Sequence, residues 1–196
     1  MHQQPLPGSR KMEFQNGVSI FVFLCRSLAL SVEVFLHRLE SFGERYIGLQ
    51  AGAAVLLMLF FPICCEGQSA EPLLLFLACF LFMCICVRAR VHLRRKRGGS
   101  QPHTLYTGTP RLMRVFRRMP EEKVKGIVEP LLTFLVGALA LGLNQTLGCY
   151  LILASLGLLV STNLTLGYER KRALDMHDAF IEQRGASERF RDLRGE

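Results

Sequence analysis

Residues 88–125 read RARVHLRRKRGGSQPHTLYTGTPRLMRVFRRMPEEKVK, and this basic segment lies between two pairs of strongly apolar runs. It holds twelve Lys and Arg side chains against two Glu, whereas residues 169–196 balance seven cations against seven carboxylates. An excess of Lys and Arg is typical of cytoplasmic loops in membrane proteins. The segment therefore predicts a cytoplasmic connector between two membrane hairpins, with both chain termini on the same side as the connector.

The apolar runs decide the fold class. The chain has 196 residues and a net charge of +8, half of its residues are hydrophobic, and only 20% are charged. Between residues 46 and 87 the only carboxylates are Glu66 and Glu71, and between 127 and 166 the only one is Glu129. A membrane helix needs about 20 apolar residues. We expect an all-α polytopic membrane protein with spans at 46–65, 73–87, 127–143 and 147–168, the second of which is short.

Composition shifts along the chain predict six regions. They are a disordered N-terminus (1–17), an amphipathic helix (18–45), a first membrane hairpin (46–87), a basic cytoplasmic loop (88–126), a second membrane hairpin (127–168) and a charged cytoplasmic tail (169–196).

The segment 18–45 has two interpretations. Phe21, Leu28, Phe35 and Phe42 recur every seven residues, with polar side chains on another row. This spacing indicates a helix with a wide apolar stripe, lying in the membrane interface or partly inserted. The alternative is a span over residues 18–36, which would move the N-terminus across the membrane.

Small residues in the apolar runs predict faces for close helix packing, because they let two backbones approach. The candidates are Gly48, Gly52, Gly137, Gly142, Gly157 and Ser161.

The basic segment itself divides into three parts. A juxtamembrane cluster suits anionic lipid headgroups, a Gly/Pro-rich stretch breaks any helix, and residues 111–119 predict a short basic amphipathic helix ending before Pro120. That helix fits the inner membrane surface or a protein partner. Few aromatics accompany the charges, which disfavours nucleic acid. The candidate contact residues are Arg94, Arg95, Lys96, Arg97, Arg111, Arg114, Arg117 and Arg118.

The polar residues give no pattern of an enzyme. No histidine pair has metal-ligand spacing on one helix, and no nucleotide, hydrolase or metalloprotease motif occurs, so we expect no catalytic residue, metal site or cofactor. Glu129 and Asn163 remain candidate intramembrane polar sites, although Glu129-Pro130 also suits a helix start at the interface. His37, with Glu33 and Glu40, fits a polar helix face. Cys64 or Cys65 is also placed to pair with Cys149 in an oxidising exterior.

Two stretches resemble small inner-membrane proteins encoded with bacterial conjugative-transfer machinery. One is Val128-Glu129-Pro130-Leu131 with Gly137; the other is residues 174–179 (LDMHDA) with Ile181-Glu182, and residues 106–110 (YTGTP) fit the same likeness. The resemblance covers the C-terminal half and implies an accessory membrane part of a transfer apparatus.

The sequence thus favours a non-enzymatic integral membrane component of a larger assembly, such as a conjugative transfer or secretion apparatus. The expected location is the bacterial inner membrane, and the expected partners are anionic lipids, other proteins or further copies of the chain. The alternative is a homo-oligomeric small channel or membrane-disrupting effector.

Overall fold

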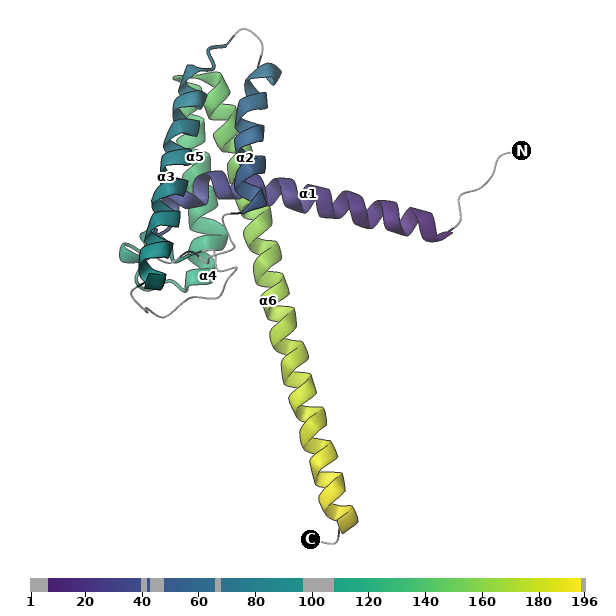
Figure 1. Ribbon diagram of the computed structural model, residues 1–196. Coiled ribbons are helices and arrows are strands. Elements are labelled where there is room, and N and C mark those ends of the chain that lie inside the picture. The colour runs from purple at the N-terminus through teal and green to yellow at the C-terminus, as the bar shows by residue number, and fades with distance from the viewer. Residues whose placement is uncertain (1–6, 40–41, 43–47, 66–67, 97–107, 195–196) are drawn as a thin grey trace, which may run out of the picture. The chain divides into compact units, whose positions relative to one another are not determined.

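The computed structural model describes residues 7–39, 42, 48–65, 68–96 and 108–194. In this part of the chain the regular secondary structure is helical, apart from one isolated β-bridge between His37 and Pro110. The elements are α1 (Pro7–Leu36), α2 (Leu49–Phe60), the 3₁₀ helix η1 (Phe61–Cys64), α3 (Glu71–Lys96), the 3₁₀ helix η2 (Arg111–Arg114), α4 (Glu121–Lys123), the π-helix η3 (Val124–Val128), α5 (Glu129–Leu141) and α6 (Gln145–Arg194) (Figure 1).

Four helical stretches in the described residues are long and apolar enough to cross a membrane. They are Gly17–Leu36, Glu71–Lys96, Glu121–Leu141 and Gln145–Arg191, while Leu49–Cys64 is apolar but shorter. The all-α class is therefore confirmed, and the composition of the helices is that of a membrane protein. The four stretches include the N-terminal segment, which the sequence favoured as an interfacial helix, in place of residues 46–65.

The N-terminal helix starts earlier than the sequence indicated. Residues 7–16 were expected to be disordered, but α1 begins at Pro7. Proline suits a first helical position because its φ angle is preset and its missing N–H has no partner there anyway. Every residue from 27 to 34 is buried. That part of α1 is thus enclosed on all sides by unit Met1–Ser161, the first of the two compact units of the chain.

Two connections near the basic segment also differ from expectation. Helix α3 continues through the cationic cluster to Lys96, so it has 26 residues rather than the 15 predicted for its apolar part. Arg94, Arg95 and Lys96 lie in its last turn, where cations interact favourably with the helix dipole. The amphipathic helix predicted over residues 111–119 is wrong: only the 3₁₀ turn Arg111–Arg114 forms. A short helix is unfavourable because few backbone hydrogen bonds offset the entropy lost in forming its first turn. Repulsion between the neighbouring arginines destabilises it further.

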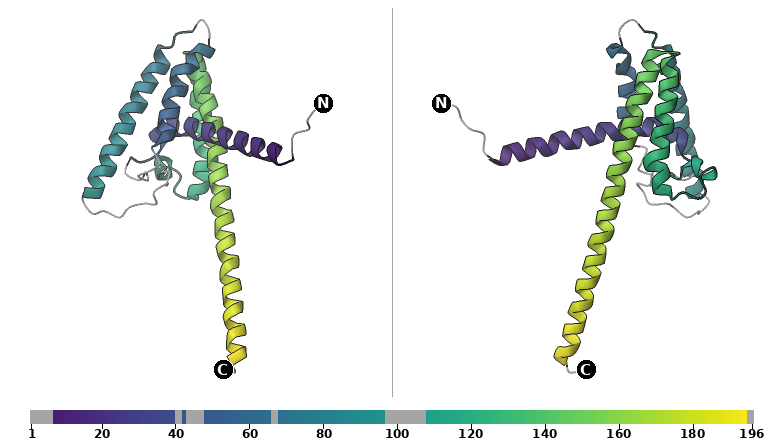
Figure 2. Two further views of the ribbon diagram at one scale, coloured as in Figure 1. Left: turned by 45° about the vertical axis from the view of Figure 1, so that its right-hand side comes forward. Right: turned by 180° about the vertical axis from the view of Figure 1, so that it is seen from behind.

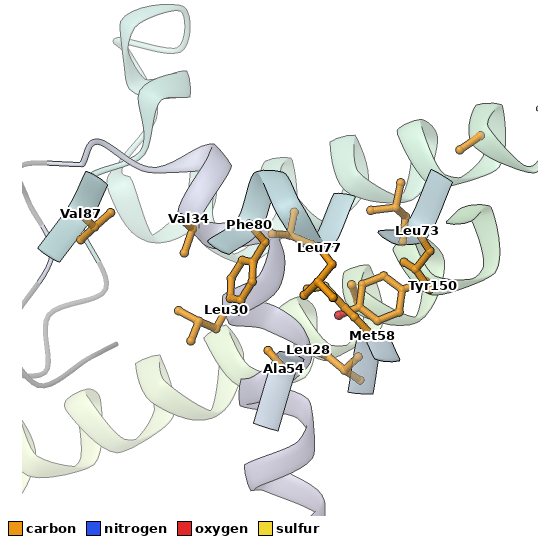
Figure 3. Packing of buried hydrophobic residues seen from close by; sticks show 14 of the residues in the cluster. Leu28, Leu30, Val34, Ala54, Met58, Leu73, Leu77, Phe80, Val87 and Tyr150 are labelled. Carbon is orange, nitrogen blue, oxygen red and sulfur yellow. The ribbon is translucent and has the colours of Figure 1, made fainter. Parts of the chain in front are cut away.

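The core of the first unit forms where α1 meets α2 and α3. Leu30, Phe80 and Tyr150 are fully buried and belong to one apolar cluster, in which Leu30 lies beside Phe80 (Figure 3). The ring of Tyr150 meets that of Phe61 edge-on, with centroids 5.4 Å apart. α2 and α3 run alongside each other, as the views in Figures 1 and 2 agree, and α1 crosses them. This packing buries the middle of α1. The end of the helix, at Leu36, leads directly into His37 of the site described below.

Large apolar side chains also cover the outside of the unit. Leu131, Leu135 and Leu139 recur every fourth residue on α5 and are 56%, 52% and 77% exposed. No described part of the chain covers this stripe. The hydrocarbon chains of a bilayer would surround it.

The turn between α5 and α6 contacts the turn before α3. The Asn144 side chain accepts a hydrogen bond from the amide of Leu147 (2.9 Å), which caps α6. Its amide Nδ2 donates to the carbonyl and hydroxyl oxygens of Ser69, at 3.1 and 3.0 Å. The two turns therefore lie at one end of the unit.

The second unit, Thr162–Glu196, consists of the C-terminal part of α6. Its apolar side chains Leu174, Met176, Phe180 and Phe190 are between 58% and 76% exposed. A single helix has no second layer against which to bury them.

Candidate functional site

A buried histidine–glutamate pair joins two segments that are 92 residues apart. His37 directly follows the last residue of α1, and its amide donates to the carbonyl of Glu33 at 2.9 Å, which continues the helical turn. Its Nε2 lies 2.9 Å from Oε2 of Glu129, and each side chain is 1% exposed. Because an ionised carboxylate only accepts hydrogen bonds, the imidazole Nε2–H is the donor whenever Glu129 is charged.

The local sequence of α4, η3 and α5 sets the position of Glu129. Pro130 lacks an amide proton, and in a regular α-helix its ring would press on the carbonyl of Gly126. The turn immediately before it is a π-helix, in which the amide of Glu129 donates to the carbonyl of Val124, five residues back. The wider turn adds a residue and so shifts the face on which Glu129 lies. Thr133 then fixes the following turn, its hydroxyl donating to the Glu129 carbonyl at 2.8 Å.

The second carboxylate oxygen of Glu129 distinguishes this pair from an ordinary buried ion pair. Oε1 is buried and accepts no hydrogen bond from the described residues. A buried carboxylate is costly unless its oxygens are satisfied, because it has lost its hydration. The π-turn and the unpartnered oxygen are two features that occur more often at functional sites than elsewhere.

The same turn of chain that carries His37 also holds the end of the basic loop. The amide of Arg38 donates to the carbonyl of Thr109 at 3.0 Å, and Nε of Arg111 donates to the carbonyl of His37 at 2.9 Å. The isolated bridge between His37 and Pro110 lies between these two bonds. We call this set, residues 37–38, 108–111 and Glu129, the clasp.

A glycine provides the turn by which the end of the basic loop reaches Arg38. Gly108 has a φ of 93°, in the left-handed region that L side chains rarely adopt, and it is buried. The chain therefore turns there at no steric cost and delivers the Thr109 carbonyl to Arg38.

The basic segment emerges directly from the clasp. Arg111, Arg114, Arg117 and Arg118 are exposed, as are the apolar side chains Val115 (74%), Phe116 (37%) and Met119 (43%). Arg94, Arg95 and Lys96 lie on the last turn of α3, and Arg97 falls outside the described residues. The structure thus places a mixed cationic and apolar surface, which we call the basic surface (residues 111–119), next to the clasp.

The glycines predicted for helix packing have very different surroundings. A Cβ on Gly157 would lie 2.8 Å from Cβ of Leu28 and 2.9 Å from the carbonyl of Cys25, and one on Gly137 would lie 3.0 Å from Ile152. Ser161 is buried. In contrast, Gly48 precedes α2 and is exposed, Gly52 has nothing within 4 Å, and Gly142 ends α5 with only the Leu139 carbonyl nearby.

The structure also describes the other polar residues that the sequence singled out. Asn163 is exposed and belongs to the second unit. The seven cysteines all lie in described residues and are free, so the structure contains no bond between Cys64 or Cys65 and Cys149. Within the described residues no three His, Cys, Asp or Glu side chains gather in a way that could hold a metal ion.

Sequence reasoning recognised the two residues separately: it placed His37 on a polar helix face and kept Glu129 as a candidate intramembrane polar site or a helix start at the interface. The signal was weak: Glu129 is the lone carboxylate of its apolar run, and His37 ends another apolar helix. It also missed Gly148, whose added Cβ would lie 2.5 Å from the Leu141 amide, and the buried hydroxyl of Thr146, which has no hydrogen-bond partner among the described residues.

Chemically, the pair can hold a proton between a nitrogen and an oxygen, and it can keep the loop in place. Comparison with known proteins adds no further constraint: no family model, no curated protein and no solved structure matches the chain.

Proposed function

We propose that the chain is a non-enzymatic integral membrane component that holds a basic surface at the cytoplasmic face of a larger membrane assembly, such as a bacterial conjugative transfer or secretion apparatus. The observation that carries this proposal is the clasp. Two backbone-directed hydrogen bonds and a buried pair tie the start of the basic surface to the helical core. A loop that served only as a topology signal would not need such an anchor.

The orientation follows from charge. The connection between α2 and α3 (residues 66–70) and that between α5 and α6 (residues 142–144) carry no Lys or Arg, and the contact of Asn144 with Ser69 supports placing both on one side. The cationic end of α3 and the basic surface then belong on the other side, which the positive-inside bias makes cytoplasmic. The inner membrane is the membrane implied by the resemblance to transfer proteins.

The chemistry of the basic surface fits anionic lipid headgroups first. Exposed Val115 and Phe116 can enter the headgroup region while the arginines on either side of them pair with phosphates. The second unit offers a separate contact, because its exposed Phe180 and Phe190 give a protein partner apolar anchors beside mixed charges.

The test is purification of the full-length protein in mild detergent, followed by mass spectrometry of co-purifying proteins and lipids. Charge reversal at Arg114→Glu/Arg117→Glu should abolish recovery of anionic lipid. The matched control Arg114→Lys/Arg117→Lys keeps the charge and should retain it. Deletion from Arg170 should release protein partners but not lipid. If charge reversal changes neither set, the basic surface has no contact role and the proposal fails.

A second candidate function is a small homo-oligomeric channel, which the unpartnered Oε1 of Glu129 favours because intramembrane carboxylates often line ion pathways. Ion flux in liposomes containing the purified protein would test it. Conductance that is absent, or that is unchanged by Glu129→Gln and Asn163→Ala, would exclude this candidate.

A further inference from the structure

The clasp contains two buried ionisable side chains, His37 and Glu129, whose charges balance only in one state of protonation. With Glu129 ionised and a proton on each imidazole nitrogen, the pair is an imidazolium–carboxylate pair of zero net charge, joined by a charge-assisted hydrogen bond of 2.9 Å. Removal of one proton leaves a buried net negative charge. Addition of a proton to Glu129 leaves a buried imidazolium without its counter-ion. Both changes are unfavourable at a site where each side chain is 1% exposed.

The structure also shows where the additional proton would go. Oε2 of Glu129 is occupied by His37, whereas Oε1 is buried and has no hydrogen-bond donor among the described residues. Oε1 is therefore the free acceptor of the pair. Protonation there neutralises the carboxylate and weakens its bond to Nε2, because a hydrogen bond to a neutral acceptor is about half as strong as one to an ionised acceptor.

The pair is mechanically linked to the basic surface. The carbonyl of His37 accepts from Arg111, and the amide of the next residue, Arg38, donates to Thr109. Any movement of the His37 backbone that follows loss of its side-chain anchor must change both bonds. The ring of Phe42, whose centroid is 5.9 Å from that of the imidazole, packs on the same side chain.

Other charged groups near the pair set the background field. Along α1 and its end these are Glu33, which is buried one turn before His37, and Arg38; from the loop there is Arg111; and from α4 and η3 there is the ion pair of Lys125 with Glu121 (2.7 Å) one turn before Glu129. Lys125 is already bound to a carboxylate. Nε of Arg111 donates to the backbone carbonyl of His37.

We propose that the His37–Glu129 pair is a proton-binding site, and that its proton occupancy determines how firmly the clasp holds the basic surface. This inference rests on the proposed presenting role of the clasp and adds its regulation. The clasp is tightest when the pair carries one imidazolium and one carboxylate, and it loosens on both the acid and the alkaline side. A chain built this way would present its basic surface differently as cytoplasmic pH changes.

The experiment is hydrogen–deuterium exchange of the full-length protein in detergent, read by mass spectrometry over about pH 4 to 9, a range that brackets ordinary carboxyl and imidazole titrations. Exchange rates are corrected for intrinsic pH dependence. The protection factor of the Arg38 amide should pass through a maximum and fall about tenfold on either side, as expected when one charge-assisted hydrogen bond is weakened. Peptides from the second unit serve as the internal reference.

Two variants make the outcome decisive. Glu129→Gln keeps an oxygen acceptor for His37 but cannot titrate, so the acid side of the profile should disappear. His37→Gln keeps an amide donor and should remove the alkaline side, which provides an independent reading if the first variant does not fold. His177→Gln, on the exposed tail, should leave the profile unchanged. A flat wild-type profile, or one that Glu129→Gln and His37→Gln both preserve, overturns the proposal.

The outcome is separable from that of the proposed function. If the protection profile has its maximum but Arg114→Glu/Arg117→Glu leaves lipid recovery intact, the proton site stands and the contact role falls. If lipid recovery is lost on charge reversal but protection does not vary with pH, the contact role stands and the regulation falls.

Discussion

The imidazole of His37 and the carboxylate of Glu129 meet at 2.9 Å although 92 residues separate them, and each side chain is 1% exposed. The pair connects the end of α1 to the first residue of α5. It thereby closes a long loop of chain, which includes α2, α3 and the basic surface. Its two members are not equivalent at neutral pH, because an imidazole in water loses its proton near pH 6.5, whereas a carboxylate in water takes up a proton only near pH 4.3.

This asymmetry predicts unequal effects of truncation. Glu129→Ala leaves an imidazole that can shed its proton, so the loss is one hydrogen bond, about 1–3 kcal/mol. His37→Ala removes the hydrogen-bond donor of Glu129 and leaves its carboxylate buried without that donor. We expect this variant to lower the free energy of unfolding by about 3–5 kcal/mol. Unfolding by a denaturing detergent titrated into mild detergent measures the free energies, with the exposed His177→Ala as the control.

The double variant completes the argument. His37→Ala/Glu129→Ala should be more stable than His37→Ala alone, because the orphaned charge is gone. Additive losses in the double variant would mean that the two residues act independently and that the contact at 2.9 Å contributes nothing.

Two glycines with opposite surroundings give a matched prediction about packing. A Cβ at position 157 would lie 2.8 Å from Cβ of Leu28, whereas a Cβ at position 52 meets nothing within 4 Å. Gly157→Ala should therefore cost about 1–3 kcal/mol through overpacking against α1. Gly52→Ala should gain about 0.5–1 kcal/mol, since alanine loses less backbone entropy in a helix. The same detergent titration compares them, and equal effects would show that α1 does not press on α6 at this point.

Much of this fold follows from local sequence. Long apolar runs predict helices regardless of what they contact, so the all-α class and three of the four expected apolar stretches follow from composition and length, whereas residues 46–65 form a shorter helix. Asparagine also acts locally, since the side chain of Asn144 caps α6.

The features that depend on distant contacts could not be predicted in this way. The heptad spacing of α1 indicated one buried face, yet residues 27–34 are buried all round, because neighbouring helices enclose them. The predicted helix at 111–119 gave way to the 3₁₀ turn Arg111–Arg114, whose first residue donates from its side chain to the carbonyl of the distant His37. Nor does spacing pair His37 with Glu129, since tertiary packing alone selects that partner.

The turn at Gly108 predicts a loosening of the clasp that leaves charge untouched. Its φ of 93° costs an L residue roughly 1–2 kcal/mol, so Gly108→Ala should shift the Thr109 carbonyl away from the Arg38 amide. The hydrogen-exchange rate of the Arg38 amide should rise about tenfold, because about 1.4 kcal/mol corresponds to a factor of ten. Gly185→Ala is the control, because that glycine is helical and has nothing within 4 Å. Unchanged protection at Arg38 would show that the loop reaches the clasp without the glycine.

Arg111 allows the anchoring role to be separated from the charge of the basic surface. Its Nε donates to the His37 carbonyl at 2.9 Å, and a lysine has no nitrogen at the corresponding position. Arg111→Lys should thus keep the net charge and the recovery of anionic lipid while weakening the clasp by about 1 kcal/mol, the usual net value of one hydrogen bond. Arg114→Lys, which makes no such bond to the clasp in the described contacts, should change neither quantity. Exchange at Arg38 and lipid recovery are measured on the same samples. If Arg111→Lys lowers lipid recovery and leaves exchange unaltered, the guanidinium at this position recognises the headgroup itself and does not anchor the loop.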